Sequence, residues 1–370
     1  MKRLLCLTAG MNAGGAETFL MKVYRRIDRS KYQMDFCVTV PDNYYAEEIE
    51  SLGGKIFLVP PKSRNPIANF NEIRKIVKEN GYDCAVRVCE NSLAVLDLLA
   101  AKAGGAGRLV MRSSNANSAG TVVRILHRLF SFLPKWVPDV KLAPSTMAAE
   151  YTFGKGSVAR GEAVLLKNGL DVSYFRFDAQ IRRNKRAELE VEDRLVVGHV
   201  GRFSDQKNHS FLMDVFYEIY QQRSDAVLLL AGKGENQEMI RRKAEELGIS
   251  DAVHFLGVRS DVNHLLMAMD VFVFPSLYEG MPNTVIEAQA TGLPCVIADT
   301  ITPEADITGL VRYLPLESPE TWAEEALRKG TAPRMDTSEM LIENGYDIDS
   351  VAREFVRLIF GEALGNAIRK

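Results

Sequence analysis

A short segment between an apolar strand and a helix carries the strongest chemical signal in the sequence. It covers residues 274–288 and reads FPSLYEGMPNTVIEA. Gly280 permits a tight turn, Pro282 suits the first helical position, and the amides at such a helix start attract anions. Glu279 and Glu287 flank that start, roughly 10 Å apart at about 1.5 Å per helical residue. The spacing suits hydroxyl groups at the two ends of a sugar diphosphate and is too wide for two acids that share one proton.

Basic residues and glycines follow other strands of the same half. Gly201 and Arg202 end one apolar run, and Lys207 comes five residues after Arg202. The segments 231–235 (AGKGE) and 255–259 (FLGVR) end two more runs. Because the carboxyl ends of parallel strands meet at one edge of a sheet, we expect these groups to share a site. Two cations there suit a diphosphate. A solvated basic loop and ordinary capping or solvent-facing glutamates are the alternatives.

The elements that must position these groups alternate along the whole chain. Short apolar runs predict strands at residues 4–8, 34–40, 55–59, 84–89, 108–111, 140–143, 195–200, 226–231, 253–256, 271–274 and 295–298. Amphipathic segments predict helices at residues 16–27, 69–80, 93–103, 210–222, 237–247, 262–268 and 284–291. This order is typical of an α/β fold with parallel, doubly wound sheets.

The length of 370 residues favours two domains. We predict an N-terminal domain over 1–176 and a C-terminal domain over 194–348, with a last helix over 349–364. Residues 177–193 are rich in charge and poor in large apolar side chains, which predicts a linker.

Composition excludes several other classes of protein. Hydrophobic residues make up 46% and charged residues 25%, the balance of a soluble globular protein. No run approaches the roughly 18 apolar residues of a membrane-spanning helix, and the apolar stretch near Met1 is too short for a signal peptide. The five cysteines form no CxxC pair, which favours buried thiols in the cytosol.

In their order along the chain, these motifs resemble the donor-site motifs of the retaining glycosyltransferases of family 4. The resemblance rests on Gly201-Arg202 with Lys207, on residues 232–235 (GKGE), and on Glu279 and Glu287. Residues 14–17 (GGAE) and 166–171 (LKNGLD) also fit, and bacterial enzymes of exopolysaccharide or capsule synthesis are the most similar members. The resemblance implies the GT-B architecture, in which two Rossmann-like domains face a cleft and the last helix returns to the N-terminal domain.

The resemblance also implies roles for single residues. Arg202 and Lys207 would hold the diphosphate and stabilise the leaving charge, and Glu279 would bind hydroxyls of the donor sugar. Glu287 would bind the ribose. The other donor-binding positions implied are Gly14, Gly15, Gly201, Gly232, Val258, Arg259, Gly280, Met281, Pro282, Asn283 and Thr284. No cofactor and no divalent metal are expected. The donor would be a nucleoside-diphosphate sugar, commonly a UDP-sugar, that supplies a hexosyl or N-acetylhexosaminyl group with retention of configuration.

The acceptor side is less clear in the sequence. Many family members carry a histidine after the fifth N-terminal strand, whereas residues 111–118 (MRSSNANS) contain none. His127, in the next predicted helix, is a poor substitute, so we assign no general base. Arg112, Ser114 and Asn115 are weak acceptor-side candidates, and a purely structural role is at least as well supported for each.

A basic amphipathic segment suggests contact with a membrane. Residues 121–136 (TVVRILHRLFSFLPKW) place their basic residues on one face and aliphatic and aromatic residues on the rest. Residues 1–170 hold 24 Lys and Arg against 15 Asp and Glu, whereas residues 171–370 hold 22 against 33. We therefore expect a cytoplasmic protein that docks on the anionic inner face of the plasma membrane, with a glycan or a polyprenyl-diphosphate-linked acceptor and no nucleic acid as partner. An ordinary helix whose wide apolar face packs on the sheet is the alternative, and it explains the segment slightly better.

Three other functions fit parts of the pattern. A sugar-nucleotide 2-epimerase could use the same architecture, but the glycine-rich loops lack the histidines that its acid–base chemistry would need. A dinucleotide dehydrogenase is disfavoured because residues 10–15 are no GxGxxG fingerprint and no acidic residue ends the second strand. A catalytically silent partner subunit that binds a nucleotide sugar is disfavoured by the intact Arg202, Lys207, Glu279 and Glu287.

Overall fold

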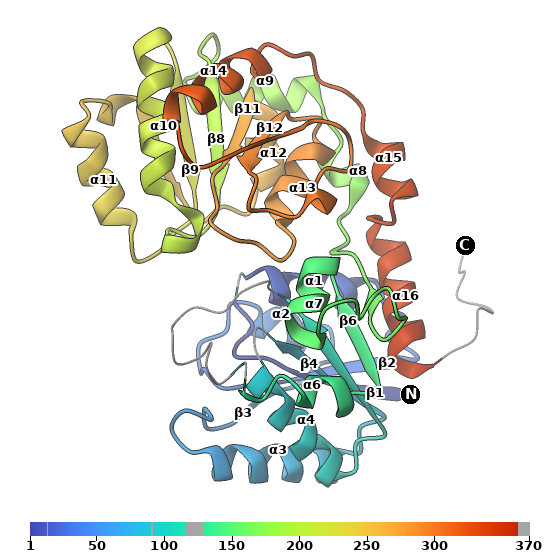
Figure 1. The fold of residues 1–370 in the computed structure, drawn as a ribbon. Coiled ribbons are helices and arrows are strands. Elements are labelled where there is room, and N and C mark those ends of the chain that lie inside the picture. The colour runs from blue at the N-terminus through green and yellow to red at the C-terminus, as the bar shows by residue number, and fades with distance from the viewer. Residues whose placement is uncertain (13, 90–91, 115–126, 128, 362–370) are drawn as a thin grey trace. The chain divides into compact units, whose positions relative to one another are not determined.

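The computed structural model describes residues 1–12, 14–89, 92–114, 127 and 129–361, and the chain forms two compact units (Figure 1). Unit 1 comprises Met1–Gly169 and Gly345–Lys370, and unit 2 comprises Leu170–Asn344. Each unit is built on a parallel sheet with helices on both faces, which is the predicted α/β class.

Unit 1 contains a seven-stranded sheet in the order β3-β2-β1-β4-β5-β6-β7, and every strand pair is parallel. Its strands are β1 (Lys2–Leu7), β2 (Tyr32–Val38), β3 (Ile56–Leu58), β4 (Cys84–Cys89), β5 (Arg108–Ser113), β6 (Val140–Ala143) and β7 (Val164–Leu165). The helices are α1 (Gly15–Arg26), α2 (Ala46–Ser51), α3 (Pro66–Asn80), α4 (Val95–Gly104), α6 (Leu133–Trp136), α7 (Thr146–Phe153) and α16 (Ile348–Phe360).

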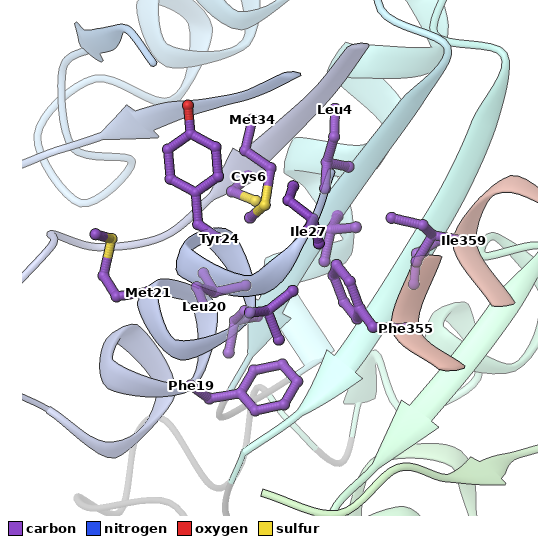
Figure 2. Packing of buried hydrophobic residues seen from close by; sticks show 14 of the residues in the cluster. Leu4, Cys6, Phe19, Leu20, Met21, Tyr24, Ile27, Met34, Phe355 and Ile359 are labelled. Carbon is purple, nitrogen blue, oxygen red and sulfur yellow. The ribbon is translucent and has the colours of Figure 1, made fainter. Parts of the chain in front are cut away.

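Alternate residues of one strand pack on opposite faces of this sheet. Leu4 and Cys6 of β1 point to the layer of α1 and α16 and form a hydrophobic cluster with the apolar side chains of these helices. Figure 2 shows side chains of this cluster. Leu5 and Leu7 point to the layer of α3 and α4. Because both faces are covered, the strands are continuously apolar rather than alternating, which is why the sequence predicted them as short apolar runs.

The final helix belongs to unit 1. Asp347 caps α16 by accepting a hydrogen bond from the Ser350 amide at 2.9 Å, and Phe355 meets Phe19 of α1 edge to face, with ring centroids 5.9 Å apart. The chain passes between the units at Gly169 and Leu170, seven residues before the predicted limit, and passes back at Asn344 and Gly345.

Unit 2 contains a six-stranded parallel sheet in the order β10-β9-β8-β11-β12-β13. Its strands are β8 (Val196–Val200), β9 (Val227–Ala231), β10 (Val253–Gly257), β11 (Val271–Phe274), β12 (Cys295–Ala298) and β13 (Val311–Leu314). The helices are α8 (Val172–Phe175), α9 (Ala179–Glu188), α10 (His209–Gln222), α11 (Gln237–Glu246), α12 (Val262–Ala268), α13 (Asn283–Ala290), α14 (Pro319–Lys329) and α15 (Ser338–Glu343).

The predicted linker over 177–193 is wrong, because most of it forms α9. Asp178 caps this helix, and α9 packs on α12. Arg182 donates hydrogen bonds to the carbonyls of Met267, Ala268 and Met269 at the end of α12. The charges that suggested a solvated linker therefore satisfy helix-end carbonyls, which otherwise lack partners.

All five cysteines are buried, and none of them forms a disulfide. Within the part of the chain that the structure describes, none of the helices combines the length and the apolarity needed to cross a bilayer.

Candidate functional site

At the carboxyl edge of the unit 2 sheet, the strand order changes direction between β8 and β11. These strands are neighbours, yet β8 leads to β9 and β10 on one side while β11 leads to β12 and β13 on the other. The loops that follow them turn away in opposite directions, and ligands of doubly wound sheets bind at such switch points. Lys207 follows β8 and Glu279 follows β11, so the topology brings these two predicted residues to one place.

Lys207 and Glu279 form an ion pair. The Lys207 Nζ lies 2.6 Å from the Glu279 Oε1 and 4.6 Å from the centroid of the Phe274 ring. The side chains are only 18% and 10% exposed, which makes the ammonium a fixed charge rather than a solvated one. Gln206 holds the two loops together, because its carbonyl accepts from the Leu277 amide and its side chain donates to the Tyr278 carbonyl, both at 2.8 Å.

Arg202 lies at the same edge but does not join this pair. Its Nη2 is 3.0 Å from the Glu235 Oε2, and its side chain is 71% exposed. Of these two predicted cations, Lys207 is therefore largely shielded from solvent, whereas Arg202 is open to it.

Glycines let the loops after β8 and β9 approach each other. A Cβ on Gly232, whose φ is +141°, would lie 2.0 Å from the Gly201 carbonyl oxygen. A Cβ on Gly234 would lie 2.2 Å from the Phe203 carbonyl oxygen. Because no side chain fits at either position, the glycine pattern follows from backbone packing at the sheet edge.

Helix α13 begins beside the ion pair. Pro282 occupies the position before the first helical residue, one earlier than predicted, and no side chain caps the helix there. Gly280 and Met281 are buried, whereas Asn283, Thr284 and Glu287 are half-buried. The start of α13 thus lies at the switch point, and Glu287 lies one turn into the helix.

In the loop after β10, Val258 is exposed, whereas the charged side chain of Arg259 is held by a carboxylate. Gly257 adopts φ +67°, and Val258 is 57% exposed. The Arg259 guanidinium donates to both Asp261 carboxylate oxygens at 2.8 and 2.7 Å, and these hydrogen bonds lower the pKa of Asp261. The side chain of Arg259 is therefore engaged by Asp261 and, at 3.5 Å, by Glu188 of α9.

The site residues predicted in unit 1 that the structure describes lie at the start of α1 and at the end of β5. Gly14 is the N-cap of α1 and Gly15 its first residue. Arg112 is buried with its guanidinium carbon 3.7 Å from the Phe19 ring centroid, and burial lowers its pKa to about 9. Because its Nη2 donates to Asn168, we interpret Arg112 as structural rather than acceptor-facing. Ser114 donates to the Cys89 carbonyl at 3.0 Å, and Asn115 lies outside the described residues.

Two buried histidines near Lys207 were missed by sequence reasoning. The His199 Nδ1 lies 2.9 Å from the Val273 carbonyl oxygen, and the His209 ring stacks on Phe203 with centroids 4.2 Å apart. Burial, with a smaller contribution from Lys207, lowers the pKa of His209 to about 4. His127 is also buried, between Ser92 and Tyr151.

The low pKa of His209 should make the protein less stable in acid. Between pH 6.5 and pH 4 the unfolded state binds a proton at this position and the folded state does not, so the free energy of unfolding falls as the pH falls. Between pH 6.5 and pH 4 the free energy of unfolding of His209→Phe should therefore fall by about 3 kcal/mol less than that of the wild type. Urea unfolding across this pH range measures the difference. Parallel pH curves for the variant and the wild type would show that His209 is already protonated when folded.

Comparison with known proteins covers nearly the whole chain. EpsF of Bacillus subtilis (strain 168), a glycosyltransferase by name, is 36% identical over 357 residues, which are 94% of this chain and 93% of EpsF. A Campylobacter jejuni protein, named N,N'-diacetylbacillosaminyl-diphospho-undecaprenol alpha-1,3-N-acetylgalactosaminyltransferase, is 27% identical over 71% of this chain and 72% of its own.

Solved structures support the fold. Anabaena HepE in complex with UDP-glucose superposes with a TM-score of 0.80 at 19% identity, over 96% of this chain and 99% of that one. The predicted GT-B class is confirmed at the level of its two Rossmann-like units. The family model described as "Glycosyl transferases group 1" matches residues 194–329, from the strand before the Gly201 loop to α14. With the match to EpsF along both units, this chain belongs to the group 1 glycosyl transferases.

Proposed function

We propose that the protein transfers a hexosyl or N-acetylhexosaminyl group from a nucleoside-diphosphate sugar, specifically a UDP-sugar, to a glycan acceptor in exopolysaccharide, capsule or lipopolysaccharide synthesis. The observation that carries the proposal is the buried pair of Lys207 and Glu279 at the switch point, next to the start of α13. The pair combines a fixed positive charge for a diphosphate with a carboxylate for sugar hydroxyls. The UDP-glucose bound to HepE, a protein of similar fold, supports this class of donor.

In this proposal the leaving diphosphate is stabilised by the protein rather than by a divalent metal. Breaking the bond between the sugar and the phosphate puts negative charge on the diphosphate. Lys207 is already oriented by Glu279 and Phe274, and Arg202 is exposed and able to turn toward the ligand. A preorganised charge of this kind costs no reorganisation when the bond breaks. The acceptor hydroxyl would attack from the face that the phosphate leaves, so that configuration is retained.

The remaining donor contacts follow from the loops. Glu287 would accept hydrogen bonds from the ribose hydroxyls, and the exposed backbone around Val258 would meet the base. The backbone of residues 280–284 would approach the sugar and the phosphates.

The acceptor in this proposal is a glycan on a polyprenyl diphosphate at the inner face of the plasma membrane. The Campylobacter relative carries an undecaprenyl-diphosphate acceptor in its name. Residues 121–126 and 128 of the basic amphipathic segment 121–136 lie outside the described residues. Its described end exposes large apolar side chains, with Leu129 63%, Phe132 53% and Trp136 83% exposed, which supports peripheral contact with lipid.

A nucleotide-binding screen tests the donor. Calorimetry against UDP, GDP, ADP and their common sugars, with and without EDTA, should show selective binding of the uridine compounds that EDTA leaves unchanged. Lys207→Ala should weaken this binding. Arg223→Ala should keep it, because Arg223 pairs with Asp225 at the opposite edge of the sheet, before β9. Selectivity for another base would replace the UDP assignment, and loss of binding in EDTA would overturn metal independence.

A further inference from the structure

Unit 1 contains a cavity of about 310 Å³ at the carboxyl edge of its own sheet. Thr8 and Ala9 line it just after β1, Arg87 and Val88 line it from the end of β4, and Lys62 lines it from the loop after β3. The first turn of α1, Leu93, Ala94 and Ser114 form the rest of the lining. The cavity is therefore assembled from the ends of several strands, as ligand sites in such sheets are.

Two cations in this cavity share one carboxylate. The Lys62 Nζ lies 2.7 Å and the Arg87 Nε 2.6 Å from the same oxygen, Asp97 Oδ2. The side chains of Lys62 and Arg87 are 25% and 14% exposed, and that of Asp97 is 8% exposed. Burial, and next the positive charge of Arg87, lower the pKa of Lys62. The cluster thus has one positive charge more than it has negative charge.

Part of the hydrogen-bonding capacity of the two cations is unused. The Nη1 of Arg87 donates to the carbonyls of Leu7 and Val88, whereas no described contact occupies its Nη2. Lys62 has three donors, and its described contacts use only the one to Asp97. Glu17 also lines the cavity, but its Oε2 is turned back toward the start of its own helix, 2.4 Å from where a Gly14 Cβ would lie. A ligand with negatively charged oxygens would satisfy these donors.

The position of the cavity matches that of the donor site in unit 2. In the unit 1 sheet β1 and β4 are neighbours, with β2 and β3 on one side and β5 to β7 on the other, so the switch point lies between them. Lys207 and Glu279 occupy the equivalent position between β8 and β11. Each unit therefore places a buried pair of a cation and a carboxylate at its switch point, and in unit 1 a second cation is added.

We infer that this cavity is a second anion site, in which Lys62 and Arg87 bind the phosphate groups of the acceptor while Asp97 holds the two cations in place. The inference rests on the proposed function for the identity of the acceptor. The same chemistry could be supplied by the diphosphate of the donor, so the experiments separate the two sources.

Binding of inorganic pyrophosphate tests the site without turnover. In full-length Lys207→Ala, whose donor site is impaired, calorimetry should still detect pyrophosphate binding. Adding Lys62→Met should weaken that binding on the order of tenfold, the scale of one lost charged hydrogen bond. Lys62→Arg should restore most of it. Lys102→Met changes an exposed lysine of the same helix α4 that carries Asp97 and should have no effect. Absence of pyrophosphate binding in Lys207→Ala, or equal binding with and without Lys62→Met, would overturn the site.

Kinetics then identify the source of the phosphate. With a short-chain prenyl-diphosphate sugar as acceptor, Lys62→Met should raise the acceptor KM about tenfold and leave the donor KM within about twofold. For the same sugar on a phosphate-free alkyl chain the acceptor KM should change less than about twofold. A rise in the donor KM instead would assign the cavity to the donor diphosphate. If the wild type transferred sugar to no acceptor, the proposed function would fail, and the pyrophosphate titration would still decide whether the site exists.

Discussion

Lys207→Ala is expected to lower kcat by a factor of about 10² to 10³, the usual cost of removing one preorganised charge from a transition state. The ammonium of Lys207 is fixed by Glu279 and by the Phe274 ring, so its position does not depend on the substrate. Water that entered after the substitution would screen the developing charge less well than a buried cation. The measurement is single-turnover transfer at saturating donor, which separates the chemical step from binding.

Two comparisons make this prediction specific. Arg202→Ala should cost less, about tenfold, because Arg202 is 71% exposed and solvent already screens its charge. Arg223→Ala, at the opposite edge of the sheet, should leave kcat unchanged. A kcat within about threefold of wild type in Lys207→Ala would exclude Lys207 as the group that stabilises the leaving diphosphate.

The sequence was sufficient to predict the two sheets because the covered strands are continuously apolar. Cys84–Cys89 and Val271–Phe274, for example, were predicted with the bounds that the structure gives. The strands β7 and β13 are missing from the prediction, because β7 has only two residues and the charged Arg312 interrupts the apolar run of β13. The charges of α9 predict a linker because sequence alone does not show that Arg182 and Arg186 donate to carbonyls of another helix.

The sequence predicts which residues lie at the strand ends of unit 2 but not which of them pair. Sequence placed Lys207 and Glu279 at strand ends, and only the strand order puts β8 beside β11. Nothing in the sequence separates Arg202 from Lys207, since the exposure of each side chain depends on how the loops fold. It also did not reveal the cavity of unit 1, because Lys62, Arg87 and Asp97 come from three separate segments with no common motif.

Gly232→Ala is expected to be the most destabilising small substitution at the donor edge, with a loss of about 3 kcal/mol or more in the free energy of unfolding. The added Cβ would lie 2.0 Å from the Gly201 carbonyl oxygen, so the loop after β8 or the loop after β9 must move. Movement of the loop after β8 displaces the segment that carries Lys207, and movement of the loop after β9 displaces residues 232–235 at the same edge, so nucleotide binding should weaken together with stability. Urea unfolding and nucleotide calorimetry on the same variant measure the two effects.

Gly248→Ala provides the matched control. Gly248 also has a positive φ, +68°, but an added Cβ there would meet nothing within 4 Å. Its substitution should therefore cost only the backbone strain, about 1 to 2 kcal/mol, and leave nucleotide binding intact. If the two variants lost equal stability, backbone conformation alone would explain the glycine at 232. A larger loss at 232, accompanied by loss of binding, would mean that the glycine is required because two loops of the donor site share the same space.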